Sequence, residues 1–164
     1  MAIDPEKSIA FLAHCLLHQE SAWLRVTSGS MAPMIPTGSQ ILITSFDDTR
    51  AIRFGDIVVF RDAQSNLIVH RVLFTQAAQK RFLQCGDNAQ SPGFVSLDTL
   101  CGVVQKVAAY EKEFDFDSCP AKLLNMVMGM TSLWILGIGK LRPEVGWFFR
   151  RLRAKIVAAM MRYV

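Results

Sequence analysis

The chain has 164 residues, of which 51% are apolar, so its length suits one domain of ordinary size with a substantial core. Its formal net charge is +4, but residues 1–139 carry 11 Lys and Arg against 13 Asp and Glu, whereas residues 140–164 carry 7 against 1. The basic character therefore belongs to the C-terminal segment. No known nucleic-acid-binding motif accompanies it, so we expect no nucleic-acid partner.

Residues 4–20 predict an N-terminal helix, because an Asp-Pro-Glu run at positions 4–6 supplies an N-cap, a first-turn proline and a first-turn acid. Two acids at this place are not typical of a secretory signal, which begins with positive charge. The apolar part of the helix, residues 8–17, is too short and too polar to span a hydrocarbon core of about 30 Å.

Residues 28–33 read Ser-Gly-Ser-Met-Ala-Pro, and Pro36 and Gly38 follow. This composition predicts a serine held on a tight, rigid turn just before a strand. Such a serine can act as a nucleophile. The alternative is that a cluster of Ser, Gly and Pro forms only a loop.

Short runs rich in β-branched and aromatic residues predict strands over residues 23–27, 40–45, 57–61, 67–74, 79–84 and 101–110. A Gly-Asp-Asn turn at 86–88 and a loop over 89–93 separate the last two. Short strands with local turns predict a mainly β (α+β) fold with a partly barrel-like core, and not a doubly wound sheet.

His70 lies within the expected strand 67–74 and is the one histidine of three that stands outside the N-terminal helix. A neutral imidazole can accept the proton of a serine hydroxyl, so a serine and a histidine supply the two groups that nucleophilic hydrolysis needs. An unperturbed histidine has a pKa of about 6.5, which predicts an activity that rises between roughly pH 6 and 8.

The four cysteines are widely spaced and include no C-x-x-C pair. We interpret them as free thiols, with a disulfide between Cys85 and Cys101 as the alternative. His14 and His18 are four residues apart but lack a third ligand, which favours a solvated pair over a metal site. We therefore expect no metal and no organic cofactor.

Several sequence blocks occur in a fixed order: Ser-Gly-Ser-Met-x-Pro, Gly-Asp-Ile-Val-Val-Phe, Val-His-Arg-Val, Gly-Asp-Asn and Gly-Val-Val. Together they cover roughly residues 23–109 and resemble the signal peptidase I family. The resemblance is to the branch of the endoplasmic reticulum, archaea and some bacteria, which uses histidine where other bacterial members use lysine. It implies a partly open β-barrel core of the signal peptidase and LexA type over residues 23–110, with an N-terminal helix in 1–22 and C-terminal helices in 120–164.

The resemblance also implies the roles of individual residues. Ser30 would be the nucleophile, and His70 the general base and later the acid. The backbone N–H of Ser30 and the hydroxyl of Ser28 would stabilise the oxyanion. The expected substrate contacts are Met31, Ile35 and Val58.

Two departures from the family are visible. Many members have a transmembrane helix before the nucleophile, and we expect none here. The acid that orients the histidine should follow the Gly-Asp-Asn block, but residues 91–93 read Ser-Pro-Gly. Asp87 is then the first candidate for the orienting acid and Asp98 the second, and a dyad without a carboxylate remains possible.

Residues 123–139 carry no charge and lie between Lys122 and Lys140. They predict either a buried or interfacial helical hairpin or a membrane span near the lower limit of length. Residues 143–164 predict a helix with one apolar face and basic residues at its sides and back, a geometry typical of a helix on an anionic membrane surface. A core-facing helix with a solvated basic face is the alternative.

The sequence thus predicts a serine endopeptidase of the signal peptidase type, which cleaves a leader or signal segment from a protein or peptide precursor after small residues. We expect association with the cytoplasmic membrane on an undetermined side, or a soluble cytoplasmic protein as the alternative. Two other functions stay open: a non-catalytic relative that binds peptides or docks on a membrane, and a self-cleaving repressor of the LexA type. The repressor requires a DNA-binding domain and a lysine base.

Overall fold

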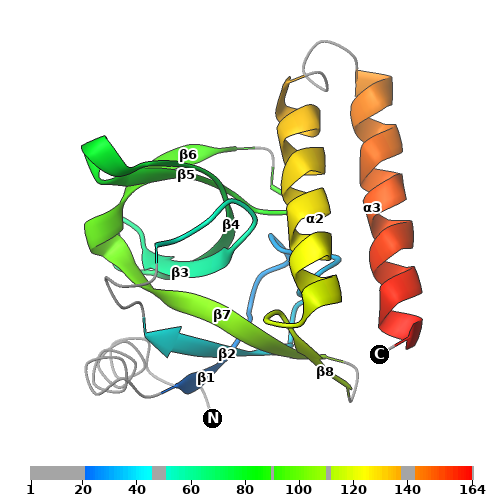
Figure 1. Ribbon diagram of the computed structural model, residues 1–164, viewed down its shortest axis with the longest axis horizontal. Helices are drawn as coiled ribbons and strands as arrows, with labels where there is room; N and C mark the ends of the chain where they lie inside the picture. The colour runs from blue at the N-terminus through cyan, green and yellow to red at the C-terminus, as the bar shows by residue number, and fades with distance from the viewer. Residues whose placement is uncertain (1–20, 46–50, 90, 110–111, 138–142, 164) are drawn as a thin grey trace.

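The computed structural model describes residues 21–45, 51–89, 91–109, 112–137 and 143–163, where eight strands precede two long helices (Figure 1). The strands are β1 (Ala22–Arg25), β2 (Gln40–Ser45), β3 (Ile57–Arg61), β4 (Leu67–Gln76), β5 (Arg81–Cys85), β6 (Gly93–Ser96), β7 (Leu100–Ala109) and β8 (Lys112–Asp115). Short 3-10 turns, η1 (Ala77–Gln79) and η2 (Leu97–Thr99), precede β5 and β7, and the helices are α2 (Cys119–Gly137) and α3 (Pro143–Tyr163). The helix expected over residues 4–20 lies outside the described residues.

The prediction of a mainly β fold is confirmed. The strands form an antiparallel sheet in the order β1-β2-β7-β3-β4-β5-β6, with β8 paired to β7. Irregularities of register occur in β2, β3 and β4, where bulges allow a sheet to bend. Strands β3 to β6 accordingly curve into a partly closed barrel beside the flatter β1, β2 and β7 layer (Figure 1).

Two strands differ from the sequence prediction. Residues 93–96 were expected partly as loop, but they form β6 and pair with β5 from Gln84 to Arg81. Residues 112–115 were not among the expected strands, but Phe114 is buried while its neighbours are exposed, so the segment forms an edge strand along β7.

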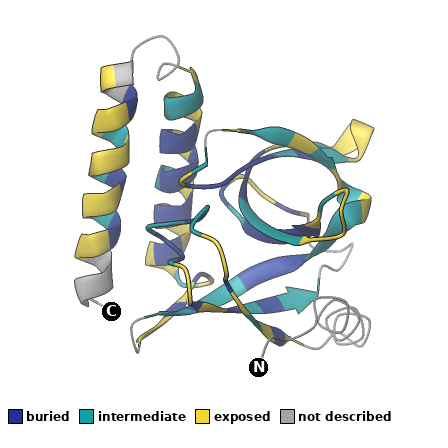
Figure 2. Ribbon diagram, turned by 180° about the vertical axis from the view of Figure 1, so that it is seen from behind, coloured by how far each residue is buried: buried dark blue, intermediate teal, exposed yellow. Residues whose placement is uncertain are grey.

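The helices form an antiparallel hairpin beside the barrel, and their buried residues line the inner sides (Figures 1 and 2). Ala121, Leu124 and Met128 of α2 join a core cluster with β1, β2 and β7 residues and with the segment 31–35. Gly129 lets α2 approach closely, because a Cβ there would lie 2.8 Å from the Phe54 ring. The hairpin is therefore packed onto the segments that lead into the barrel.

By length and composition alone, α2 is the described helix that could cross a membrane, although 39% of its apolar window is buried inside the protein. This burial agrees with the hairpin interpretation of residues 123–139, and the helix alone is weak support for a span.

Candidate active site

Ser30 lies on a compact turn between β1 and β2. The turn is closed by hydrogen bonds from the Ala32 N–H to the Gly29 carbonyl (3.1 Å) and from the Ile35 N–H to the Met31 carbonyl (2.9 Å), and the Ala32–Pro33 peptide bond is cis. Met31 and Ile35 are buried, whereas Ser30 itself keeps partial exposure. The predicted rigid turn therefore presents a hydroxyl next to residues fixed in the core.

His70 lies in β4, where it pairs with Val58 of β3. Its ring is half-buried and contacts the ring of Phe60 edge-on, with centroids 6.2 Å apart. The imidazole thus stands at the edge of the barrel core, which limits both its motion and its hydration.

Gly86 lies between the serine turn and the histidine. A Cβ at this position would be 2.7 Å from the Ser30 carbonyl oxygen and 2.8 Å from Nε2 of His70, too close for any side chain. The Asn88 N–H donates to the same Ser30 carbonyl at 2.7 Å. The Ser30 carbonyl and the imidazole of His70 therefore both lie beside Gly86, although the two residues are far apart in the sequence.

The other ring nitrogen of His70, Nδ1, is hydrogen-bonded to Oε1 of Gln84. An amide oxygen only accepts, so Nδ1 carries the proton and the free lone pair of the neutral ring is at Nε2, the atom beside Gly86. Burial lowers the pKa of His70. The hydrogen bond to Gln84 and the charge of Asp87 raise it, but they offset the effect of burial only in part. The imidazole is therefore held in the form that a general base requires.

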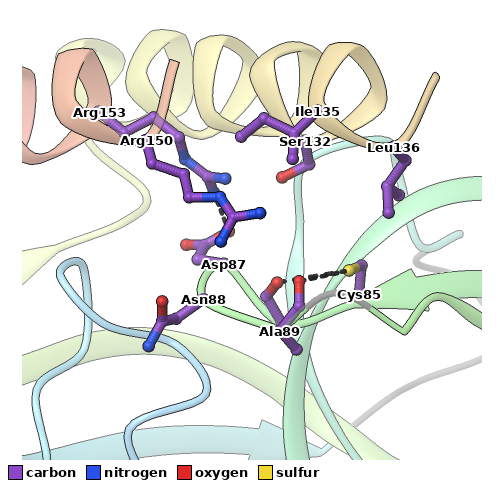
Figure 3. A pocket seen from close by; sticks show the side chains of 10 residues that line it. Cys85, Asp87, Asn88, Ala89, Ser132, Ile135, Leu136, Arg150 and Arg153 are labelled. Carbon is purple, nitrogen blue, oxygen red and sulfur yellow. Dashed lines mark hydrogen bonds and ion pairs between the residues drawn. The ribbon is translucent and has the colours of Figure 1, made fainter. Parts of the chain in front are cut away.

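Asp87 has other partners. Its carboxylate has no exposed side-chain surface and accepts from Arg71 at both oxygens, with Nε–Oδ1 2.8 Å and Nη2–Oδ2 2.7 Å. Nη2 of Arg153 in α3 donates to Oδ1 as well, at 2.8 Å (Figure 3). Gln84, and not Asp87, is hydrogen-bonded to the His70 ring. Asp87 affects the imidazole through its charge.

Arg71, the residue after the histidine, is fully buried. Besides Asp87 it donates through Nη1 to the Gly55 carbonyl and to Oδ1 of Asn125, both at 2.8 Å. One guanidinium thereby joins β4, the loop before β3, the 86–88 turn and α2.

The remaining predicted residues lie as follows. The hydroxyl of Ser28 is exposed and lies 3.4 Å from that of Ser30. Asp98 lies in η2, after β6, where its backbone N–H donates to the hydroxyl of the N-cap residue Ser96 and its carboxylate accepts from that hydroxyl. The predicted substrate contacts are in the core, since Met31 is 1% exposed and Ile35 and Val58 are 0% exposed. Such burial fits residues that support the site from beneath and does not fit contact with a peptide.

Cys85, Cys101 and Cys119 are free thiols, so the alternative of a Cys85–Cys101 disulfide is wrong. In the part of the chain that the structure describes, no three His, Cys, Asp or Glu side chains gather closely enough to hold a metal ion.

Gln84 was not among the residues that the sequence indicated. The feature that could have indicated Gln84 is the strand register. Gln84 pairs with Val72 across β4 and β5, so it is a diagonal neighbour of His70 on the same face of the sheet. That register depends on a bulge between Val72 and Phe74, so it could not be read before the fold was known.

Two comparisons with known proteins show what the chain is similar to. Signal peptidase I W of Bacillus subtilis (strain 168) is 34% identical over 65 residues, which are 38% of this chain, and the match spans about a third (34%) of that protein. The family described as Peptidase S24-like matches residues 2–107, a stretch that contains Ser30, His70 and Gln84. The chain belongs to the Peptidase S24-like family.

Proposed function

We propose that the protein is a serine endopeptidase of the signal peptidase type, with Ser30 as nucleophile and His70 as base. The observation that carries the proposal is that the Ser30 backbone and Nε2 of His70 both lie beside Gly86, each within 3.0 Å of the point where its Cβ would be. Membership of a peptidase family and the similarity to a signal peptidase support it.

The proposed reaction has two halves. Ser30 Oγ attacks the scissile carbonyl while Nε2 of His70 takes the hydroxyl proton, and the imidazolium then protonates the leaving amine. Water attacks the acyl-enzyme in the same way, and Ser30 recovers its proton. Gln84 keeps the ring oriented throughout, in the place of the carboxylate for which Asp87 was the first candidate.

The oxyanion of each tetrahedral intermediate needs donors that are already in place. The backbone N–H of Ser30 and the hydroxyl of Ser28 are our candidates, and the position of the Ser28 hydroxyl beside that of Ser30 supports the second. One such donor typically lowers a barrier by about 3 kcal/mol.

The proposed substrate is an extended segment of a protein or peptide precursor, cut after small residues. An extended pose suits a sheet with free edges, to which a peptide can be added as a strand. The preference for small residues rests on the resemblance to signal peptidases and on the similarity to one of them.

We also propose that the hairpin rests on an anionic membrane surface. Leu133, Trp134, Trp147 and Phe148, which we call the tip cluster, are 42–61% exposed at the adjoining ends of α2 and α3. Trp134 reaches α3, where its ring contacts that of Phe149. The guanidinium of Arg151 lies over the Trp147 ring, so a cation adjoins an aromatic ring there.

Ser30→Ala and His70→Ala should each lower peptide cleavage by about a thousandfold or more, because each removes one half of the dyad. The measurement is mass spectrometry of a peptide library that varies the residue before the cut. Ser91→Ala, in an exposed loop, should cleave like the wild type. Full cleavage by Ser30→Ala would refute the serine mechanism, and a wild type that cleaves nothing would favour the peptide-binding alternative.

The rising limb of kcat/KM should have its midpoint below pH 6.5, the ordinary histidine value, because burial lowers the pKa of His70 and the base acts in its neutral form. This replaces the range of roughly pH 6 to 8 expected from an unperturbed histidine. A pH profile of the wild type checks it, and a midpoint above 6.5 would contradict the buried environment of the ring.

Gln84→Met should lower kcat about tenfold to a hundredfold, because the ring loses the acceptor that holds the proton on Nδ1. Gln84→Glu keeps an acceptor and should stay active with its rising limb at higher pH, since a carboxylate stabilises the imidazolium. Gln64→Met, in an exposed loop, is the control. Equal activity of Gln84→Met and the control would show that Gln84 has no orienting role.

Trp147→Ser should weaken binding to vesicles of mixed anionic and zwitterionic lipid by about tenfold, since burying a large apolar side chain is worth about 1.5 kcal/mol or more. Phe74→Ser, on the barrel, is the matched control, because Phe74 is 52% exposed and Trp147 61%. Equal sedimentation of both variants with vesicles, or none by the wild type, would refute the membrane role of the tip cluster.

A further inference from the structure

The cavity between the hairpin and the 85–89 segment is lined by groups from both (Figure 3). Ser132, Ile135 and Leu136 come from α2, and Arg150 and Arg153 from α3. Of the two arginines Arg153 is the buried one, with only 4% of its side chain exposed, and it reaches from α3 to Asp87. Helix α3 therefore contacts the 86–88 turn, which lies beside Ser30 and His70.

This contact is not explained by charge balance. Arg71 already neutralises Asp87 with two parallel hydrogen bonds, so Arg153 brings a second positive charge into a buried group of three. Nε of Arg153 is buried and has no hydrogen-bond partner among the described residues. Buried ion pairs contribute little net stability, and an excess charge with an unsatisfied donor contributes less. Stability alone is thus a poor reason for Arg153 to be there.

Its position offers a better reason. Asp87 lies between Gly86, where a Cβ would collide with both Ser30 and His70, and Asn88, whose N–H donates to the Ser30 carbonyl. Arg71 holds the Asp87 carboxylate from the barrel side, and Arg153 holds it from the hairpin side. A carboxylate held from two directions leaves the 86–88 turn little freedom to move relative to the serine and the histidine.

We propose that Arg153 is a positioning residue for the peptidase reaction and that the C-terminal hairpin is, through it, a working part of the active site. This proposal rests on the proposed serine peptidase function. The match to the Peptidase S24-like family ends at residue 107, so the contribution of Arg153 lies outside the shared family region.

Arg153→Met should lower kcat about tenfold to a hundredfold with KM changed less than about twofold, because a displaced turn misaligns the reacting groups without removing a substrate contact. Rates are to be normalised to the active-site concentration, titrated with a serine-directed phosphonate, so that misfolded protein does not count. Lys155→Met removes the same charge from an exposed position of the same helix and should match the wild type.

The second readout is the pKa of His70, measured by NMR titration of the imidazole in the Ser30→Ala protein. The charged and titratable groups around Asp87 are Arg71 from β4, Arg153 and Arg150 from α3, and the thiol of Cys85. Removing Arg153 leaves the imidazolium more negative surroundings, so the pKa should rise and the rising limb of kcat should move to higher pH. A merely structural arginine would lower the amount of folded protein without moving either value.

Arg153→Lys restores the charge without the planar donor arrangement, and it should return the pKa of His70 to the wild-type value while recovering part of kcat. The proposal is overturned if Arg153→Met, or Arg153→Lys where the methionine variant does not fold, keeps the wild-type kcat per titrated site and an unshifted His70 pKa. The NMR readout needs no substrate, so a protein that cleaves no peptide would refute the proposed function while the link between Arg153 and His70 is still measured.

Discussion

The buried bidentate pair between Arg71 and Asp87 is the interaction on which the site depends. Arg71 has no exposed surface, and its guanidinium joins the strand that carries His70 to the 86–88 turn, to the loop before β3 and to α2. Breaking such a pair by removing one partner typically costs 3–5 kcal/mol, about a third or more of the stability of an ordinary domain. The Arg71–Asp87 pair therefore maintains the geometry around Ser30 and His70, although neither residue takes part in the proposed reaction.

Geometry and electrostatics act together at this place. Gly86 allows the serine turn and the imidazole to approach, and Gln84 leaves Nε2 free to accept a proton. Partial burial keeps the imidazole neutral at a lower pH than usual, which suits a base. Asp87 adds a negative charge that Arg71 and Arg153 largely cancel. The amide of Gln84 contacts the ring, and the carboxylate of Asp87 holds the 86–88 turn, so in the proposed site two residues share the role expected of one orienting acid.

The sequence predicted those features that arise from local pattern. Six strands followed from β-branched runs between turns, whereas the roles expected of Ser30 and His70 came from the resemblance to signal peptidases. β6 and β8 did not, because one begins at a glycine in a loop-like stretch and the other is an edge strand rich in charge. Gln84 and Arg153 could not be predicted, because their partners lie 14 and 66 residues away and are defined only by register and helix packing. Met31, Ile35 and Val58 show the opposite case: the resemblance suggested them as substrate contacts, and the fold buries them.

The central claim, that the hydroxyl of Ser30 is activated by His70, can be tested most directly by mapping the covalent adduct of a peptidyl phosphonate by mass spectrometry. A single adduct is expected on Ser30 in the wild type, and none in His70→Gln under the same conditions. An adduct on Ser28 or another serine, or equal labelling of Ser30 when His70 is replaced, would contradict it.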